Sequence, residues 1–250
     1  MDINYTDINS QTIDSWNKDG WEWAKMIDHE TYVKALNGDW GVYLSPTKTV
    51  PLDWFCPMKG AKILGLASGG GQQMPIFTAV GAKCTVMDYS KEQLNNEKIV
   101  SKREDYDIEI VHGDMTKTFP FDDESFDLVF HPVSNCYIED VGHVWKECFR
   151  VLKKGGILLA GFDNEINFAF DENDKLKYIL PYNPLKDKKL LEEGLKNNDG
   201  VQFSHTIEEQ IGMQLKAGFV LADIYSDTNG FGKLHEHNVS TFYCTKSLKI

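Results

Sequence analysis

Three consecutive glycines, Gly69 to Gly71, follow the short apolar stretch ILGLAS. A turn needs only one glycine, and glycine weakens both the strand before it and the helix after it. Three in a row indicate that another group comes very close to the main chain. Asp88 ends the next apolar stretch, 19 residues after Gly69 (88 − 69). An acidic side chain at about this distance from a glycine loop is typical of a carboxylate that accepts hydrogen bonds from ribose hydroxyls. Together these residues predict a site for a nucleoside cofactor.

The glycine loop does not match the usual nucleotide-binding patterns. The dinucleotide motif G-x-G-x-x-G would place its glycines at Gly69, Gly71 and position 74, where this chain has Met74. A phosphate-binding loop of the Walker type needs Lys followed by Ser or Thr after the glycines, and neither pair follows them here. The pattern therefore disfavours a pyrophosphate ligand and excludes a Walker loop.

Five strand-like apolar stretches alternate with helical patterns and would position these residues. In the helix with the clearest pattern, Asp140 is the predicted N-cap and apolar residues recur on one face as far as Leu152. Ser90 and Gln93 form a capping box for an earlier helix. Strands that are apolar throughout are buried on both faces, which indicates a parallel sheet between layers of helices. The predicted strands span residues 63–67, 84–87, 108–111, 126–130 and 157–162.

Three further segments complete the predicted α/β, doubly wound (Rossmann-like) fold. Residues 1–60 contain five of the six tryptophans and predict a helical N-terminal cap or lid over a main domain at 61–250. The polar residues from 163 to 205 predict an insertion after the fifth strand. Strands at 219–225 and 239–244 are joined by a connection too short for a crossover helix, so they should be antiparallel. The expectation is a mostly parallel seven-stranded sheet with an antiparallel last strand.

Composition limits the partners of the protein. A formal net charge of −12 disfavours nucleic acid, whose binding needs a local surplus of Lys and Arg. The five cysteines contain no C-x-x-C pair and are too scattered for a zinc site, so we expect reduced thiols and no metal. The polar, acidic start is unlike a signal peptide. No apolar stretch approaches the roughly 20 residues of a membrane span, so we expect a cytoplasmic protein with no membrane partner.

Five motifs in register resemble those of a known enzyme family. ILGLASGGG, VMDYS, HGDM, FPFDDESFDLVFHP and FRVLKKGGILLAGF occur in the order and spacing of the motifs of class I S-adenosylmethionine-dependent methyltransferases. The resemblance covers roughly residues 60–162, and the terminal strand pair matches the reversed last strand of that family. It implies S-adenosyl-L-methionine as the cofactor and S-adenosyl-L-homocysteine as its product.

The resemblance also implies which residues bind the cofactor. Asp88 would accept hydrogen bonds from the ribose hydroxyls, with Tyr89 near the adenine. Asp114 would accept one from the adenine amino group, and Met115 would cover a face of the ring. His131 would lie near the methionine end or the transferred methyl group, and the glycine loop would pass beside the methionine part. The implied set is Ala67, Ser68, Gly69, Gly71, Gln72, Gln73, Asp88, Tyr89, Ser90, Asp114, Met115 and His131.

One position departs from the family pattern. The family usually has an acidic residue where this chain has Gly65, and that acid helps to orient the amino group of the methionine part. Gln72 and Gln73 are candidates to replace this contact. The acids expected at the ribose and the adenine are both present.

The chemistry implied is an in-line displacement that needs little covalent help, because the methyl group of a sulfonium is already activated. A general base is needed only if the acceptor arrives protonated. His131 is the best-placed candidate for that base, and contact with the cofactor or a cap on the strand is the alternative role. His131-Pro132-Val133-Ser134-Asn135 differs from the Asn-Pro-Pro-Tyr type of motif in amide and nucleobase methylases. Because this motif differs and the charge disfavours nucleic acid, the sequence predicts a small-molecule acceptor.

Two other functions stay open from the sequence. A nicotinamide-dependent (NAD(P)) oxidoreductase would share the sheet and the ribose acid, but the missing third glycine counts against it. A non-catalytic, cofactor-binding regulator is compatible with Gly65 and with the lack of an obvious base.

Overall fold

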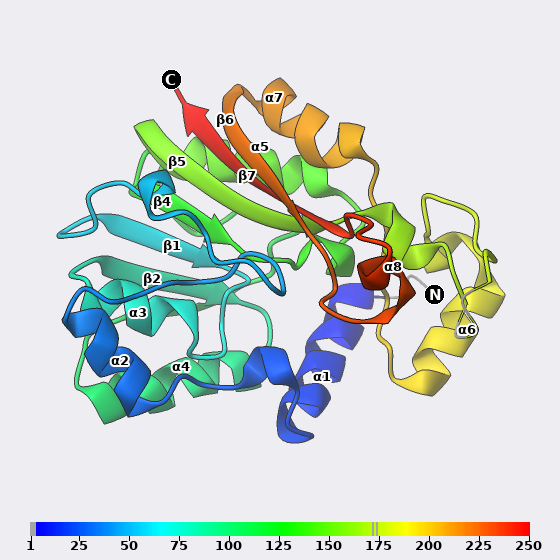
Figure 1. Cartoon of the computed structure of the whole chain (residues 1–250), viewed down its shortest axis with the longest axis horizontal. Coiled ribbons are helices and arrows are strands. Elements are labelled where there is room, and N and C mark those ends of the chain that lie inside the picture. Colours follow the sequence, from blue (N-terminus) through cyan, green and yellow to red (C-terminus); the bar gives the residue numbers. More distant parts are fainter. Residues whose placement is uncertain (1–3, 172, 174) are drawn as a thin grey trace.

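Seven strands form one sheet in the order β3-β2-β1-β4-β5-β7-β6 (Figure 1). The computed structural model describes residues 4–171, 173 and 175–250. Strands β1 to β5 pair in parallel, and β7 is antiparallel to both of its neighbours, β5 and β6. The strands are β1 (Lys62–Leu66), β2 (Lys83–Asp88), β3 (Glu109–His112), β4 (Phe126–His131), β5 (Leu152–Asp163), β6 (Phe219–Asp227) and β7 (Phe242–Lys249). The predicted mostly parallel sheet with a reversed last strand is confirmed.

The last strand differs from its prediction in position. It was expected at 239–244, but β7 begins at Phe242 and continues to Lys249. Polar residues such as Thr245 and Ser247 suggest that the strand has already ended, but both side chains are fully buried. The Ser247 hydroxyl donates a 2.7 Å hydrogen bond to the side-chain oxygen of Gln214, which is itself buried. This partner on a neighbouring helix makes polar strand residues compatible with the interior.

Helices cover both faces of the sheet (Figure 1). Helices α3 and α4, with α2 packed on α3, lie on one side, and α5 and α7 lie on the other. A single π-helical turn (Glu208–Gly212) leads into α7, and Thr206 and Glu209 form a capping box at its start. The helices are α1 (Tyr5–Lys18), α2 (His29–Leu36), α3 (Gln73–Ala79), α4 (Lys91–Glu104), α5 (Val141–Val151), α6 (Lys188–Asn197), α7 (Met213–Ala217) and α8 (Gly232–Glu236).

Alternate positions of each strand supply two apolar cores. On β1, Ile63 packs in one core with Phe77 of α3, and Leu64 packs in the other core with Trp145 of α5. All four side chains are fully buried. Asp140 caps α5 as predicted, because its Oδ1 accepts a 2.9 Å hydrogen bond from the Gly142 amide. Burial of both faces explains why the strands are apolar throughout.

The N-terminal segment has two structural roles. Val42, Leu44 and Trp54 are buried in the same core as Ile63, so residues 40–56 pack directly on the sheet. Helix α1 instead packs against α4 near the carboxyl ends of the strands (Figure 1). The segment after β5 contains 3-10 turns at Glu165–Phe168 and Pro184–Lys186, followed by α6.

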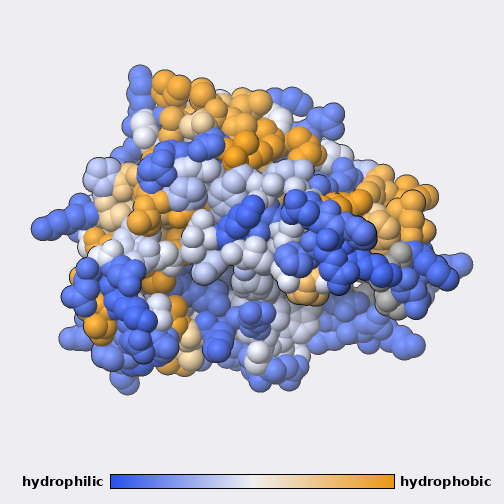
Figure 2. Space-filling view, viewed as in Figure 1, coloured by the Kyte–Doolittle hydropathy of each residue, from blue (hydrophilic) through white to orange (hydrophobic). Residues whose placement is uncertain are grey.

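Most of the surface in this view is hydrophilic, while apolar side chains gather at the top, over edge strand β6 and α7 (Figure 2). Leu215, Val220 and Ile224 are exposed there. In the part of the chain that the structure describes, no helix has the length and apolar character needed to cross a membrane.

Candidate active site

The glycine loop joins β1 to α3 at the carboxyl edge of the sheet. Ala67, Gly70 and Gly71 all have positive φ angles, of 47°, 101° and 71°. Glycine adopts this region without steric cost, whereas the strain at Ala67 marks a tightly constrained turn. The Ala67 amide donates a 2.8 Å hydrogen bond to the carbonyl of Met87 on β2. The loop is thereby held against the end of the neighbouring strand.

The groups that come closest to the glycines are side chains of the protein itself. A Cβ on Gly69 would lie 2.7 Å from Cβ of Gln93 and 2.9 Å from Oδ2 of Asp88. A Cβ on Gly71 would lie 2.7 Å from Cγ2 of Val100. The glycines therefore allow α4 and the end of β2 to pack on the loop, in addition to opening its main chain to the cavity.

Glu97 of α4 fixes the loop from behind. Its Oε1 accepts a 2.8 Å hydrogen bond from the Gly71 amide, and its Oε2 is buried with no hydrogen-bond partner in the part of the chain that the structure describes. The side chain is fully buried. Burial raises the pKa of Glu97 to about 8, although the Gly71 hydrogen bond opposes this shift.

Glu97→Gln should remove a pH dependence of stability. Because the pKa of Glu97 in the folded state lies above its unfolded value near 4.5, its contribution is most favourable below about pH 4.5 and is lost as the pH rises toward 8. The glutamine keeps an acceptor for Gly71 and cannot ionise. We expect its free energy of unfolding, relative to wild type, to improve on the order of 4 kcal/mol between pH 4.5 and 8.5. Urea unfolding at several pH values measures this difference. Glu92→Gln, a less buried acid on the same helix, is the control, and parallel curves for Glu97→Gln and wild type would refute the prediction.

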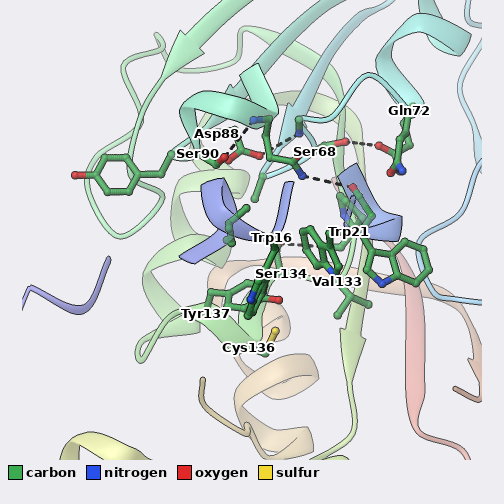
Figure 3. Close-up of a pocket in the computed structure, with 18 of the residues that line it drawn as sticks. Trp16, Trp21, Ser68, Gln72, Asp88, Ser90, Val133, Ser134, Cys136 and Tyr137 are labelled. Atoms are coloured by element: carbon green, nitrogen blue, oxygen red, sulfur yellow. Dashed lines mark hydrogen bonds between the residues drawn. The ribbon is translucent and has the colours of Figure 1, made fainter. Parts of the chain in front are cut away.

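Asp88 lies at the end of β2 and faces the loop (Figure 3). Its Oδ2 accepts a 3.1 Å hydrogen bond from the Gly69 amide, and its Oδ1 accepts one of 2.9 Å from the Ser90 amide. Burial raises the pKa of Asp88, and these two amides partly offset the shift. Each oxygen keeps a lone pair, so the carboxylate can accept two further hydrogen bonds.

Tyr89 connects the site to α1. Its hydroxyl donates a 2.5 Å hydrogen bond to Asp7, and its ring stacks on His112 with centroids 5.1 Å apart. The hydrogen bond to Asp7 is the main reason that the pKa of Tyr89 is raised to about 12. The hydroxyl of Ser10 donates to the Tyr89 carbonyl at 2.7 Å.

Asp114, just after β3, is also held by α1. Its Oδ2 accepts a 3.0 Å hydrogen bond from the Thr6 hydroxyl, and its Oδ1 accepts one of 2.8 Å from the Thr116 amide. Met115 is buried in the core beside it and reaches the cavity wall. Ser90 lines the cavity, but its hydroxyl donates to Asp14 at 2.6 Å and accepts from the Gln93 amide as the N-cap of α4.

The position of the missing acid is filled from α3. A Cβ on Gly65 would lie 2.6 Å from the sulfur of Met74, whose side chain is fully buried. Gln73 lines the cavity and accepts a 3.0 Å hydrogen bond from the Ser68 hydroxyl. Gln72 also lines the cavity, and its amide donates to the carbonyl of Lys25 at 3.1 Å.

These elements enclose a cavity of about 860 Å³. Figure 3 shows its two halves, with Asp88 and Ser90 beside the glycine loop and Trp16, Trp21 and Tyr137 on the opposite wall. Ten of the twelve residues implied by the sequence line this cavity, namely Ala67, Ser68, Gly69, Gln72, Gln73, Asp88, Tyr89, Ser90, Asp114 and Met115. The volume lies toward the upper end of the usual range for ligand sites.

His131 and Gly71 are not brought to the cavity wall, contrary to the expectation for both. Gly71 lies behind the loop, where its amide binds Glu97. His131 is fully buried at the end of β4, with Nδ1 donating to the Leu66 carbonyl at 2.9 Å and Nε2 2.8 Å from Oδ1 of Asn135. Burial lowers the pKa of His131. Its geometry matches the alternative role of securing the strand end.

The N-terminal tryptophans divide between the site and the core. Trp16, Trp21 and Trp23 line the cavity, and Trp16 packs against Trp21 with ring centroids 5.3 Å apart. Trp54 is buried against the sheet, and Trp40 packs on aromatic residues of that core. The aromatic-rich N-terminus therefore contributes some tryptophans to the wall of the cavity and others to the core.

Sequence reasoning missed the side chains of α1 that contact the site, above all Thr6, Asp7 and Asp14. These residues lie in a polar helix about 80 to 110 positions from their partners. A helix with polar groups on the face toward the domain was the only available signal.

The described residues fit an adenosyl cofactor. Two carboxylates, of Asp88 at the end of β2 and of Asp114 just after the neighbouring parallel strand β3, line the cavity together with the glycine loop. Ligands of doubly wound sheets bind at this edge, near the point where the strand order reverses. Among the described residues, no group of three or more His, Cys, Asp or Glu side chains could hold a metal ion.

Comparison with known proteins agrees with this geometry. A family model described as a methyltransferase domain matches residues 64–160. The uncharacterized methyltransferase YbaJ of Bacillus subtilis (strain 168) is 40% identical over 250 residues, covering 97% of this chain and 97% of that protein. A demethylmenaquinone methyltransferase of Geobacillus sp. (strain WCH70) is 28% identical over 190 residues, covering 71% of this chain and 78% of that protein.

Solved structures share the fold. An S-adenosylmethionine-dependent methyltransferase from Mesorhizobium loti superposes with a TM-score of 0.62 at 16% identity, covering 78% of this chain and 94% of that one. The geranyl diphosphate C-methyltransferase of Streptomyces coelicolor A3(2), solved with S-adenosyl-L-homocysteine, gives 0.54 at 14% identity over 77% of this chain and 74% of that one. The cofactor is S-adenosylmethionine, and the chain belongs to the class I S-adenosylmethionine-dependent methyltransferase family.

Proposed function

We propose that this methyltransferase transfers the methyl group to a small-molecule acceptor. The observation that carries this proposal is the half of the cavity opposite the glycine loop. Its wall is formed by Trp16, Trp21, Leu44, Val133 and Tyr137, from α1, the 40–56 segment and the residues after β4 (Figure 3). An apolar, largely aromatic chamber of this kind suits a compact organic molecule.

The names of relatives and the charge of the chain support the same acceptor class. The demethylmenaquinone methyltransferase is named for a small-molecule acceptor. The net charge of −12 is unfavourable for a phosphate backbone. Because a small acceptor fits inside the cavity, methyl transfer to it needs no extended binding surface outside the cavity.

Each half of the cavity has a distinct task in the proposed mechanism. Asp88 accepts hydrogen bonds from the ribose hydroxyls and Asp114 from the adenine amino group, next to Met115. The main chain at Ala67 to Gly69 borders the methionine part. Gln72 and Gln73 take the role of the acidic residue that the family usually has at the position of Gly65. When bound, the cofactor supplies an activated methyl group on a sulfonium.

The protein contributes mainly by holding the acceptor in line with that methyl group. Orientation of two reactants can lower a barrier by roughly 7–11 kcal/mol. Helix α1 acts as the lid of the proposed N-terminal cap, since Thr6 and Asp7 tie it to Asp114 and Tyr89. A closed lid excludes water and so strengthens the polar contacts inside.

Thermal unfolding with ligands tests the cofactor half of the proposal. S-adenosyl-L-homocysteine at 100 times its Kd should stabilise the protein by about 2.7 kcal/mol. For a chain of this size that corresponds to a Tm increase of roughly 5–11 °C. NAD at the same concentration should leave the Tm unchanged, and the reverse result would favour an oxidoreductase.

Release of S-adenosyl-L-homocysteine in the presence of small organic acceptors tests the second half. We expect turnover with at least one uncharged, ring-bearing compound and none with RNA oligonucleotides. Tight binding of the product without turnover on any small molecule would favour the non-catalytic regulator.

A further inference from the structure

Asp163 is a buried carboxylate without a hydrogen-bond partner among the described residues. It ends β5, which is otherwise apolar from Ile157 to Phe162, and its side chain is 4% exposed. Neither Oδ1 nor Oδ2 has a hydrogen-bond partner in the described part of the chain. An unpaired buried charge is costly, and in proteins such groups usually have a functional reason.

The other buried acids of the protein show what is unusual here. Asp227 is equally buried and accepts hydrogen bonds from the hydroxyl of Ser45 and from the amides of Thr47, Lys48 and Thr228. Glu147 binds the guanidinium of Arg150 and the amide of Phe119. Glu97 has the amide of Gly71. These three acids have structural partners, whereas Asp163 has none among the described residues.

The strand register places Asp163 beside the cavity. Asp163 pairs with Phe242 of the antiparallel strand β7, and paired residues of such strands project from the same face. Phe242 lines the cavity. On the same face of β5, Gly161 contacts Leu44, which also lines the cavity.

Two further residues of the cavity wall, in the 3-10 turn Asn135–Tyr137 after β4, are close enough to feel the charge of Asp163. Burial is the main reason that the pKa of the Cys136 thiol is raised, and the charge of Asp163 is the second. This charge also contributes to raising the pKa of the Tyr137 hydroxyl, after burial and Cys136. Asp163 is therefore close to Phe242, Cys136 and Tyr137, which line the acceptor end of the cavity, while Asp163 itself lies outside the lining.

We propose that Asp163 is the general base of the reaction and that the acceptor is an uncharged aromatic compound carrying a weakly acidic hydroxyl. This inference rests on the proposed function. The aromatic wall of Trp16, Trp21 and Tyr137 provides surfaces for a ring. A neutral amine has a free lone pair and needs no base before attack, whereas a hydroxyl becomes a strong nucleophile only as it loses its proton.

The step balances with the groups already named. A lone pair of the hydroxyl oxygen forms the bond to the methyl carbon, and the carbon–sulfur bond breaks with its electron pair remaining on sulfur. The hydroxyl proton moves to the Asp163 carboxylate. The products are a methyl ether, S-adenosyl-L-homocysteine and neutral Asp163, which returns its proton to water.

Two properties of Asp163 suit this role. Burial raises its pKa to about 7, near the value at which a general base is most effective at neutral pH. Cys136 and Tyr137, the titratable groups whose pKa values its charge raises, are neutral there. Binding of the acceptor must move one side chain of the wall, and Tyr137, which is only partly buried, is the one with room to move.

Thermal unfolding of Asp163→Asn is the first test, with wild type and Asp227→Asn measured from pH 5.5 to 8.5 in saturating S-adenosyl-L-homocysteine. If Asp163 has no structural partner, the Asp163→Asn protein should equal or exceed the Tm of wild type at pH 8.5. Asp227→Asn should lower the Tm at every pH because it disrupts a hydrogen-bonded carboxylate. A lower Tm for Asp163→Asn at every pH would show a structural role and overturn the proposal.

Binding and turnover with 1-naphthol are the second test, with 1-methoxynaphthalene as the probe that lacks the hydroxyl and aniline as the amine. Titration calorimetry on the complex with S-adenosyl-L-homocysteine should show wild type preferring 1-naphthol to its ether. Asp163→Leu, of similar size and without polar atoms, should lose that preference. Both variants should bind S-adenosyl-L-homocysteine within about threefold of wild type.

In turnover, wild type should methylate 1-naphthol with a kcat/KM that rises through pH 7, and Asp163→Asn should lower it about 100-fold or more and flatten the profile. An unchanged rate in Asp163→Asn, or methylation of aniline but not of 1-naphthol, would overturn the proposal and leave the proposed function standing. No binding of 1-naphthol to wild type would also count against it. If no small molecule is methylated although the product binds, the proposed function fails as well.

Discussion

Asp88→Ala is expected to weaken binding of S-adenosyl-L-homocysteine by roughly 10- to 100-fold, because charge-assisted hydrogen bonds to the ribose contribute about 1.5–3 kcal/mol. The carboxylate also accepts hydrogen bonds from the amides of Gly69 and Ser90. Alanine therefore removes both a ligand contact and the group that holds the glycine loop to β2. Asp88→Asn keeps one acceptor oxygen and should have an intermediate affinity. Titration calorimetry measures both dissociation constants.

A matched control separates loss of the contact from loss of the fold. Glu109 is an exposed acid at the start of β3, outside the cavity. Glu109→Ala should bind the product with the affinity of wild type. If Asp88→Ala folds with a normal circular dichroism spectrum and binds the product as tightly as wild type does, the ribose does not bind at Asp88.

Gly161→Ala is expected to destabilise the protein by about 3 kcal/mol or more, at the upper end of the cost of overpacking a core. A Cβ at this position of β5 would lie 2.1 Å from the carbonyl oxygen of Leu44 and 2.8 Å from its carbonyl carbon. Both are main-chain atoms, so the clash cannot be relieved by a change of rotamer. The 40–56 segment would have to move away from the sheet, and the Tm should fall by roughly 6–12 °C.

The affected segment also forms part of the acceptor half of the cavity. The Leu44 carbonyl accepts a hydrogen bond from the Val133 amide, and both residues line the cavity. Gly161→Ala should therefore impair methyl transfer more than binding of the product. Gly212→Ala is the control, since a Cβ there meets only Cβ of Glu208 at 3.8 Å in a helical conformation. It should be neutral or slightly stabilising. Equal Tm values for the two variants would refute the predicted clash.

The sequence by itself determined the sheet, and it predicted residues for the half of the site that we propose binds the cofactor. Continuous apolar strands, the glycine loop and the acids at strand ends are local patterns, and the topology of a parallel sheet brings strand ends to one edge. The spacing from the glycine loop predicts a ribose contact for Asp88, whereas the role of Asp114 follows only from the resemblance to the methyltransferase family. Both line the cavity.

Only the tertiary structure decided which distant groups meet these residues. Thr6 binds Asp114 and Asp7 binds Tyr89 across more than 80 positions, and no periodic pattern specifies such a partner. The position of His131 at the end of a strand predicted a place near the cofactor, but in the folded protein its side chain is fully buried. Asp163 reads in the sequence as the polar end of a strand, and only the packed structure shows that its carboxylate has no hydrogen-bond partner among the described residues. Periodicity determines which residues face inward, whereas hydrogen-bond partners and cavity walls depend on how separate elements pack.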